Sequence, residues 1–302
     1  MIKRECGWYN SLSNYFRQKY KERLFKIPLS LPLTCPNRDG TKGRGGCIYC
    51  GPSGSGTGDI RPVETQLDDG IKRGKRAGFS FFMAYFQAYS NTYASLDFLK
   101  KEWSVVLKFP EIVAISVGTR PDCVDKERLE LLSSFSDKRE VWIEYGLQSM
   151  HNRTLNLIER GHTKEDFERA VLQTKEYPLK ICVHLILGLL GESLKDMIET
   201  ARWVSSLPVH GVKLHCLYVE KGSKLEKIYN SSSVKLMTRR EYAETAVQVM
   251  ENLREDIIMH RIVSDCPKDK LIAPEWLLDK NASIAEIRSV FKIRNSYQGC
   301  AV

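Results

Sequence analysis

Three cysteines near the start of the chain offer the clearest chemistry in the sequence. Cys35, Cys47 and Cys50 stand in the segment TCPNRDGTKGRGGCIYC, with the spacing C-x11-C-x2-C. Thiolates are good ligands for zinc and for iron–sulfur clusters. A structural zinc site takes four protein ligands, and no histidine or further cysteine follows before Cys123. Three ligands leave one metal position open, and in a [4Fe–4S] cluster that open iron can bind a small molecule.

Polar residues and glycines recur where strand-like runs of the sequence end. Gln87, Arg120, Gln148 and Gly188 each close such a run, and residues 218–221 close another. In parallel β/α barrels the carboxyl ends of the strands form one rim, where functional residues gather. We therefore expect these positions and the cysteine segment to meet at one end of a barrel.

The elements that must position these residues alternate between strand-like and helix-like patterns. This alternation predicts right-handed βαβ units and a parallel sheet. Six units can be counted, whereas a full barrel has eight, so we predict an α/β fold with an incomplete (β/α)6 parallel barrel, open on one side. The expected strands are Phe25–Leu31, Phe79–Gln87, Ile112–Arg120, Val141–Gln148, Leu179–Gly188 and Val212–Val219.

The helices between these strands are expected from apolar residues that recur with the helical period. Thr238 is expected to cap the last of them. The barrel would occupy residues 27–265, between an N-terminal extension (1–26) and a C-terminal extension (266–302). The expected helices are Val63–Ala77, Leu96–Phe109, Asp125–Phe135, Lys164–Glu176, Leu194–Leu207 and Arg239–Leu253.

Composition narrows the class of protein. The chain has 302 residues, of which 42% are apolar and 10% aromatic, so it can bury a large core. The longest apolar run, residues 185–191, is far shorter than the roughly 18 residues of a membrane span, and no export signal precedes the barrel. We therefore expect a cytoplasmic protein without a membrane partner. Nine cysteines, an odd number, favour metal binding or catalysis over disulfides.

The formal net charge of +9 favours a polyanionic partner. Residues 1–26 concentrate seven Lys or Arg side chains and six aromatic ones. Two interpretations stay open. The extension forms either a surface that binds nucleic acid or an amphipathic helix that packs Leu12, Tyr15, Phe16 and Leu24 against the barrel.

Several ordered segments resemble the radical S-adenosylmethionine (SAM) enzymes. The tyrosine inside CIYC is typical of that superfamily, and the wide first cysteine spacing resembles its elongator-like branch. Together the segments resemble the bacterial YhcC/YtqA-type radical SAM proteins over about residues 7–275. They are YFQAYSNTYA (85–94), GTRPD (118–122), EYGLQS (144–149), RGHT (160–163) and HLILGLLGE (184–192).

The resemblance implies a role for each motif residue. Cys35, Cys47 and Cys50 would hold a [4Fe–4S] cluster whose fourth iron binds the amine and carboxylate of SAM. Glu144 and Gln148 would reach the methionine amine or the ribose, and the arginines suit a carboxylate. For each polar residue, a structural hydrogen bond or ion pair is the alternative. The expected SAM-binding residues are Gln87, Arg120, Glu144, Gln148, Arg160 and Gly188.

The resemblance also implies a reaction and a partner. The enzyme would reductively cleave SAM to a 5′-deoxyadenosyl radical, with electrons from an external donor. Its substrate would be the tRNA wobble uridine, whose carboxymethylaminomethyl group at C5 would become aminomethyl. The chain is expected to be too short for an added acetyltransferase domain. Two alternatives remain: radical chemistry on a small metabolite or porphyrin, and a non-catalytic iron–sulfur protein that binds RNA or senses redox state.

Overall fold

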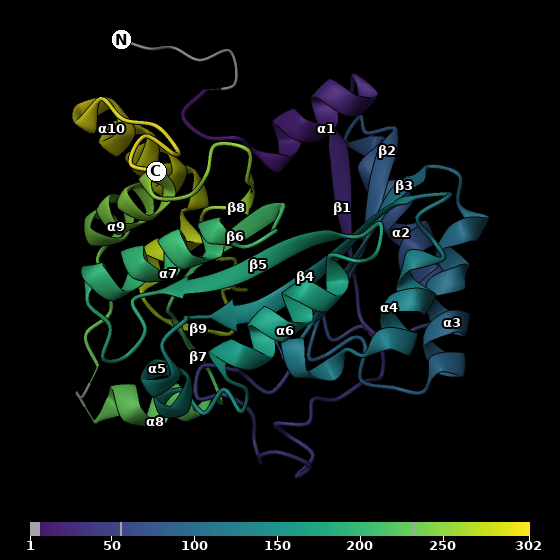
Figure 1. Ribbon diagram of the computed structural model, residues 1–302, viewed down its shortest axis with the longest axis horizontal. Coiled ribbons are helices and arrows are strands. Elements are labelled where there is room, and N and C mark those ends of the chain that lie inside the picture. Colours follow the sequence, from purple (N-terminus) through teal and green to yellow (C-terminus); the bar gives the residue numbers. More distant parts are fainter. Residues whose placement is uncertain (1–6, 55, 232–233) are drawn as a thin grey trace.

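A seven-stranded parallel sheet forms the centre of the protein. The computed structural model describes residues 7–54, 56–231 and 234–302. Every neighbouring pair in the order β1-β2-β3-β4-β5-β6-β8 is parallel, and the sheet curls into part of a barrel (Figure 1). The strands are β1 (Leu24–Leu29), β2 (Phe81–Phe86), β3 (Ile112–Thr119), β4 (Glu140–Gln148), β5 (Lys180–Leu187), β6 (Gly211–Cys216) and β8 (Ile258–Arg261).

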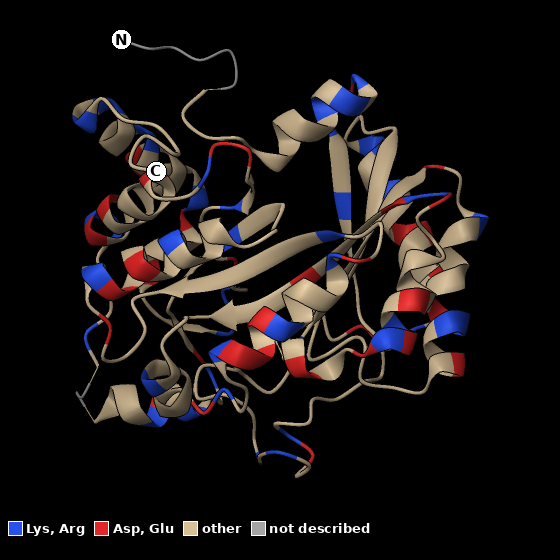
Figure 2. Ribbon diagram, in the orientation of Figure 1, with Lys and Arg blue, Asp and Glu red and all other residues tan. Residues whose placement is uncertain are grey.

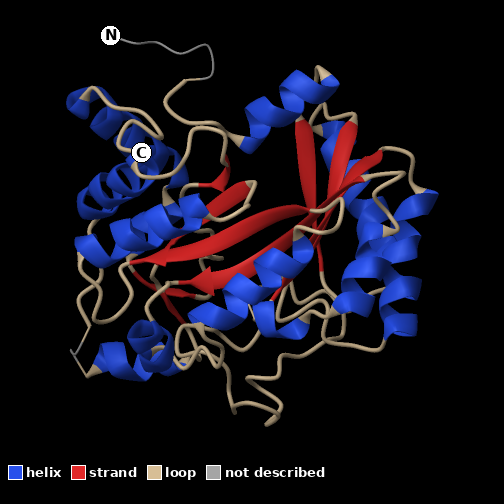
Figure 3. Ribbon diagram, viewed as in Figure 1, coloured by secondary structure: helices blue, strands red, loops and turns tan. Residues whose placement is uncertain are grey.

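Helices cover the outer face of this sheet (Figure 3). Their apolar sides and the outward side chains of the strands form one large core. Charged residues of both signs lie on the helices (Figure 2). The crossover helices are α2 (Val63–Arg76), α3 (Leu96–Ser104), α4 (Lys126–Ser133), α6 (Lys164–Thr174), α7 (Leu194–Ser206) and α9 (Arg239–Glu251).

The predicted α/β partial barrel is confirmed, with one strand more than expected. All six predicted strands and all six predicted helices are present, with ends that differ by a few residues. The predicted helix 96–109 ends at Ser104 and continues as a 3₁₀ turn. Thr238 caps α9 through a reciprocal capping box with Glu241. The unpredicted β8 pairs with β6, and within the described residues the two end strands β1 and β8 do not pair with each other, so the barrel is open; Ser11 forms an isolated parallel bridge with Met259 of β8.

Shorter elements complete the carboxyl-terminal part of the fold. β7 (Val219–Glu220) and β9 (Leu271–Ala273) form a small antiparallel sheet. α10 (Lys280–Arg294) packs on α9, and no helix of the described residues is long and apolar enough to cross a membrane. The other short elements are α5 (Asn152–Leu157), α8 (Lys224–Asn230), and the 3₁₀ turns η1 (Val105–Lys108), η2 (Pro121–Cys123) and η3 (Glu275–Leu278).

The N-terminal extension closes one end of the barrel. In α1 (Leu12–Tyr20), Phe16 is fully buried among side chains from the beginnings of five strands. Lys19 pairs with Glu140 at the start of β4. The helix lies at the opposite end of the sheet from the loop after β1 (Figure 1). The structure therefore agrees with the packing interpretation of this extension. Its residues Lys3, Arg4 and Cys6 lie outside the described residues.

Candidate active site

The loop between β1 and α2 carries the three predicted cysteine ligands. Backbone hydrogen bonds close its turns, from Arg38 N–H to the Cys35 carbonyl (2.7 Å) and from Cys50 N–H to the Cys47 carbonyl (3.0 Å). Gly46 has a φ of 84°, and a Cβ there would lie 2.9 Å from Nε of Arg38. Glycine is therefore needed where the loop turns back toward the second cysteine.

Each of the three sulfur atoms faces a guanidinium group. Cys47 Sγ lies 3.4 Å from Nη1 of Arg160. Cys50 Sγ lies 3.7 Å from Nη2 of Arg38, and Cys35 Sγ lies 4.0 Å from Nη1 of Arg120. A cation beside each sulfur favours the thiolate, which is the form that binds metal.

These cations affect two of the thiols differently. Burial raises the pKa of Cys47, but Arg160 and Arg120 outweigh it and hold this pKa below its ordinary value. At Cys50, burial and the nearby Cys47 outweigh Arg38, and the pKa rises to about 11. Cys47 is therefore more readily ionised than Cys50, and a metal must displace the Cys50 proton when it binds.

The positions of the sulfur atoms fit a cluster better than a single ion. Within the described parts of the chain, two groups of potential ligand atoms gather within 4.8 Å of one another, and the three cysteines form neither. One tetrahedral zinc with Zn–S bonds of about 2.3 Å would hold its sulfur atoms about 3.8 Å apart. At least one pair of these sulfur atoms is more than 4.8 Å apart, and three such thiols, each beside a cation, suit a multi-iron group. A [4Fe–4S] cluster therefore fits these residues.

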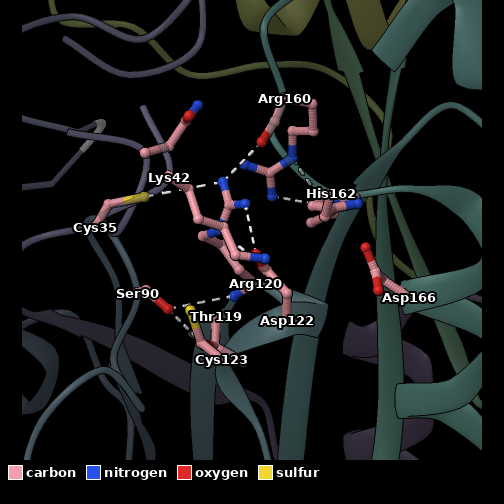
Figure 4. Close-up of polar contacts among 12 residues, drawn as sticks. Cys35, Lys42, Ser90, Thr119, Arg120, Asp122, Cys123, Arg160, His162 and Asp166 are labelled. Carbon is pink, nitrogen blue, oxygen red and sulfur yellow. Dashed lines mark hydrogen bonds and ion pairs between the residues drawn. The ribbon is translucent and has the colours of Figure 1, made fainter. Parts of the chain in front are cut away.

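Arg120 and Arg160, both expected near SAM, are anchored by the protein itself. Arg120 donates to both carboxylate oxygens of Asp122 (2.8 and 2.9 Å) and to the carbonyl oxygen of Arg160 (2.8 Å; Figure 4). Arg160 donates from Nε and Nη2 to the Gly146 carbonyl (3.2 and 2.6 Å). Most of their N–H groups are thus occupied. The structure places both arginines as partners of the thiols, and their contact with SAM stays a prediction.

The cysteine loop borders a cavity of about 390 Å³ at the carboxyl ends of the strands. Gly188 lies outside its lining: its φ is 84°, its N–H donates to Sδ of Met197 (3.3 Å), and an added Cβ would face Met237. The other eight predicted site residues line this one cavity: Cys35, Cys47, Cys50, Gln87, Arg120, Glu144, Gln148 and Arg160.

Other side chains that could contact a substrate also meet there. Tyr89, His184 and His215 line the cavity. The thiol of Cys123, which follows Asp122 in the rim segment 118–122, is buried. Burial above all raises its pKa to about 11, so this thiol is held protonated.

Strained backbone marks the same rim. Ala88, Tyr89 and Gln148 have φ values of 79°, 53° and 77°, and all three line the cavity. Residues other than glycine adopt such angles only where the surrounding structure imposes them, and such residues cluster at functional sites. At Gln148 the pairing of β4 with β5 also shifts register. The predicted rim residue thus sits at an irregularity that re-aims the end of the strand.

Glu144 lies at the floor of the cavity in a buried ion network. Its carboxylate pairs with Lys213, lies 3.4 Å from Nζ of Lys26, and accepts hydrogen bonds from Ser116 Oγ (2.6 Å) and His184 Nε2 (2.7 Å). Burial raises the pKa of Glu144, but the two lysines outweigh it and hold it well below its ordinary value. Because the protein already satisfies this carboxylate, its contact with SAM stays a prediction.

Several residues of the site were missed by the sequence analysis. Lys26, counted there with the basic extension, lies inside the barrel and Lys213 lies opposite it. Both interrupt apolar strands, LFKIPL and VKLHC, and a charge inside a buried strand was a usable signal. Arg38 was also missed, although it follows the predicted ligand Cys35 closely in the chain. Arg261 reaches the cavity from β8, a short strand that the sequence patterns did not reveal, whereas Glu220 lies in the segment 218–221 that was expected at the rim.

Comparison with known families identifies two matching regions. The profile of the Radical SAM superfamily matches residues 37–204, more than half of the chain, and that of the Radical SAM C-terminal domain matches residues 209–292. The chain is 32% identical to the uncharacterized protein YtqA of Bacillus subtilis, over 96% of this chain and 92% of that protein. It is 34% identical to YhcC of Escherichia coli K12, over 92% of this chain and 90% of that protein.

More distant relatives share only part of their length with this chain. A protein of Methanocaldococcus infernus named tRNA uridine(34) acetyltransferase is 27% identical over 53% of this chain, which spans 30% of that protein. Among solved structures, an archaeal Elp3 of the same organism superposes with a TM-score of 0.69 at 15% identity. The alignment covers 91% of this chain and 64% of the Elp3 chain. At that identity the superposition supports the fold alone.

Proposed function

This chain belongs to the radical SAM superfamily, and we propose that its substrate is the wobble uridine of tRNA, on which it converts a C5 carboxymethylaminomethyl group to aminomethyl. It is an enzyme that uses a [4Fe–4S] cluster and SAM. When bound, these two groups supply a one-electron cleavage of SAM and a carbon radical that removes a hydrogen atom from the substrate. In the net reaction, one SAM and one water would be consumed: the carboxymethyl carbons would leave as glyoxylate, the nitrogen would stay on the uridine as aminomethyl, and SAM, as the two-electron oxidant, would become methionine and 5′-deoxyadenosine. Membership in this enzyme family sets aside the non-catalytic alternative.

The protein's own contribution is to hold, orient and shield these groups. Cys35, Cys47 and Cys50 would hold the cluster, and their neighbouring arginines would offset its negative charge. Gln148 and Gln87, at the ends of β4 and β2, would offer amide donors and acceptors to the ribose or the methionine portion of SAM. The cavity would exclude water and oxygen around the reacting atoms.

The observation that carries the RNA proposal is the similarity to tRNA uridine(34) acetyltransferases over 53% of this chain. The cavity adds support. Tyr49, Tyr89 and Tyr218 line it, and aromatic rings are surfaces on which an unstacked nucleobase can stack. Arg38 and Lys270 also line it, and cations there suit the phosphates next to an inserted nucleotide.

The position of this cavity indicates where RNA would dock. Loops at the carboxyl ends of the strands surround the cavity, and Lys and Arg residues lie along them (Figure 2). The basic N-terminal helix lies at the other end of the barrel. We therefore place the RNA at the cavity and not on α1, so reversing the charge of Lys21, which caps the end of this helix, should change RNA affinity little.

Anaerobic assays with defined RNA test the proposal. Reconstituted enzyme, dithionite and SAM are mixed with an anticodon stem-loop that carries carboxymethylaminomethyluridine at the wobble position. We expect aminomethyluridine and 5′-deoxyadenosine in equal amounts, and neither in excess of background for the Cys47→Ser variant. Formation of 5′-deoxyadenosine without any change in the RNA would contradict the RNA substrate and favour the small-metabolite or porphyrin alternative.

A further inference from the structure

An ion network directly beneath the floor of the cavity carries an excess of positive charge. Two ammonium groups, on Lys26 and Lys213, face the single carboxylate of Glu144. Burial lowers the pKa of Lys26 to about 8, which keeps it largely protonated at neutral pH. His184 adds no charge, because burial and Lys213 lower its pKa to about 4. One of the two ammonium charges therefore has no counter-ion within this network.

Arg261 adds a further cation beside the floor. It lines the cavity, and its charge acts on both Lys213 and His215. Its guanidinium pairs with Asp265 (2.9 Å), but Asp265 is half exposed and also binds Lys280 (2.8 Å). A shared and partly hydrated carboxylate offsets Arg261 only in part.

His215 offers a hydrogen-bonding atom that the protein leaves unused. Its Nε2 is buried and has no hydrogen-bond partner among the described residues. Burial, Arg261 and the neighbouring imidazole of His184 all lower the pKa of His215 well below its ordinary value, so its ring is neutral. Buried polar atoms are nearly always paired, so an unpaired one that lines a cavity points to a missing ligand.

We propose that the floor of the cavity is a carboxylate-binding subsite in which His215 and Arg261 bind the acidic group of the substrate over the Lys213 ammonium. This inference rests on the proposed function and deepens it, because the carboxymethylaminomethyl substituent ends in a carboxylate. A carboxylate supplies the negative charge that the floor lacks and two oxygen acceptors for the imidazole and guanidinium donors. The methionine carboxylate of SAM is the other source of the same chemistry, so the test must separate the two.

Binding of two nearly isosteric RNAs by the reconstituted enzyme tests the subsite. One anticodon stem-loop carries carboxymethylaminomethyluridine, and the other carries its carboxamide, which keeps the shape and removes the charge. We expect the wild type to prefer the carboxylate at least tenfold, since hydrogen bonds to charged groups are the stronger ones. The preference should fall below twofold in both His215→Leu and Arg261→Gln. Lys75→Gln, which removes a cation paired with Glu111 on an exposed surface, should keep it.

The outcomes distinguish this inference from the function on which it rests. Equal affinity of the wild type for both RNAs would overturn the carboxylate subsite and leave RNA binding intact, and this comparison needs no variant to fold. A preference that survives in both variants would overturn the assignment to His215 and Arg261. Failure of the wild type to bind either RNA would overturn the proposed function together with the inference.

Equilibrium dialysis with SAM alone identifies the source of the carboxylate. We expect His215→Leu and Arg261→Gln to bind SAM within twofold of the wild type. A tenfold loss of SAM affinity with the RNA preference unchanged would assign this subsite to the cofactor and overturn our proposal.

Discussion

Phe16→Ala should destabilise the protein strongly, because Phe16 closes the barrel at the end opposite the cysteines. Its ring is fully buried and packs with Met83 and Trp142 at the beginnings of two strands. It also lies 5.1 Å from the ring of Tyr15 and 5.8 Å from that of Tyr20, measured between centroids. Truncating a buried phenylalanine to alanine typically costs about 3–5 kcal/mol. We take about 4 kcal/mol as the expected loss.

Urea unfolding followed by tryptophan fluorescence measures this loss. With an m-value of about 3 kcal/mol/M, a loss of about 4 kcal/mol lowers the unfolding midpoint by about 1.3 M. Arg17→Ala is the matched control, because Arg17 is exposed on the same helix, and its midpoint should move by less than about 0.2 M. A shift below 0.3 M for Phe16→Ala would refute the closing role of α1 and reopen the nucleic-acid interpretation of this extension.

Three further predictions concern the site. Arg160→Gln removes the cation at 3.4 Å from Cys47 Sγ, so the pKa of this thiol should rise. Iodoacetamide labelling of Cys47 in the iron-free protein at pH 7.5 should then slow at least threefold, and an unchanged labelling rate would contradict the role of Arg160. Gln148→Ala should keep the cluster iron but bind SAM about tenfold more weakly, because it loses a hydrogen bond worth about 1.4 kcal/mol. Unaltered SAM affinity in equilibrium dialysis would show that Gln148 does not contact the cofactor. Burial lowers the pKa of Lys26 from 10.5 to about 8 in the folded protein, so between these pH values the unfolded chain binds more protons than the folded one. The free energy of unfolding should therefore increase by up to about 3 kcal/mol from this group as the pH rises from 8 to 10.5. Thermal unfolding of Lys26→Met should lack that increase, and pH profiles identical to those of the wild type would refute the assignment.

The fold was predictable where its signals are local. Buried parallel strands are nearly continuous apolar runs, so β2 to β6 stand out in the sequence. Thr238 was identified as a cap because the capping contact spans only three residues. By contrast, β8 has four residues, two of them basic or histidine, and exists as a strand only because β6 pairs with it. Its formation depends on a contact distant in sequence, which periodicity cannot reveal.

The site was predictable where the chain itself brings residues together or ends a strand. The three cysteines share one short loop, and Gln87, Arg120 and Gln148 end or directly follow parallel strands, so the rim could be inferred. Depth within the barrel could not be inferred, because it depends on how neighbouring strands are staggered. Glu144 comes only four residues before Gln148, yet it lies in the ion network at the floor. The sequence patterns also do not show at which end of the sheet a helix packs. In the structure α1 packs at the end opposite the cavity, so its basic residues do not face the site.

Nucleoside analysis of tRNA tests the central claim most directly. Total tRNA is isolated from cells that lack the gene, and from the same cells complemented either with the wild type or with Cys47→Ser. The tRNA is then digested, and the wobble nucleosides are measured by mass spectrometry. We predict that carboxymethylaminomethyluridine accumulates, and aminomethyluridine and nucleosides derived from it disappear, in the deletion and Cys47→Ser cells, with restoration only by the wild type. Wobble nucleosides identical in all three strains would contradict the account.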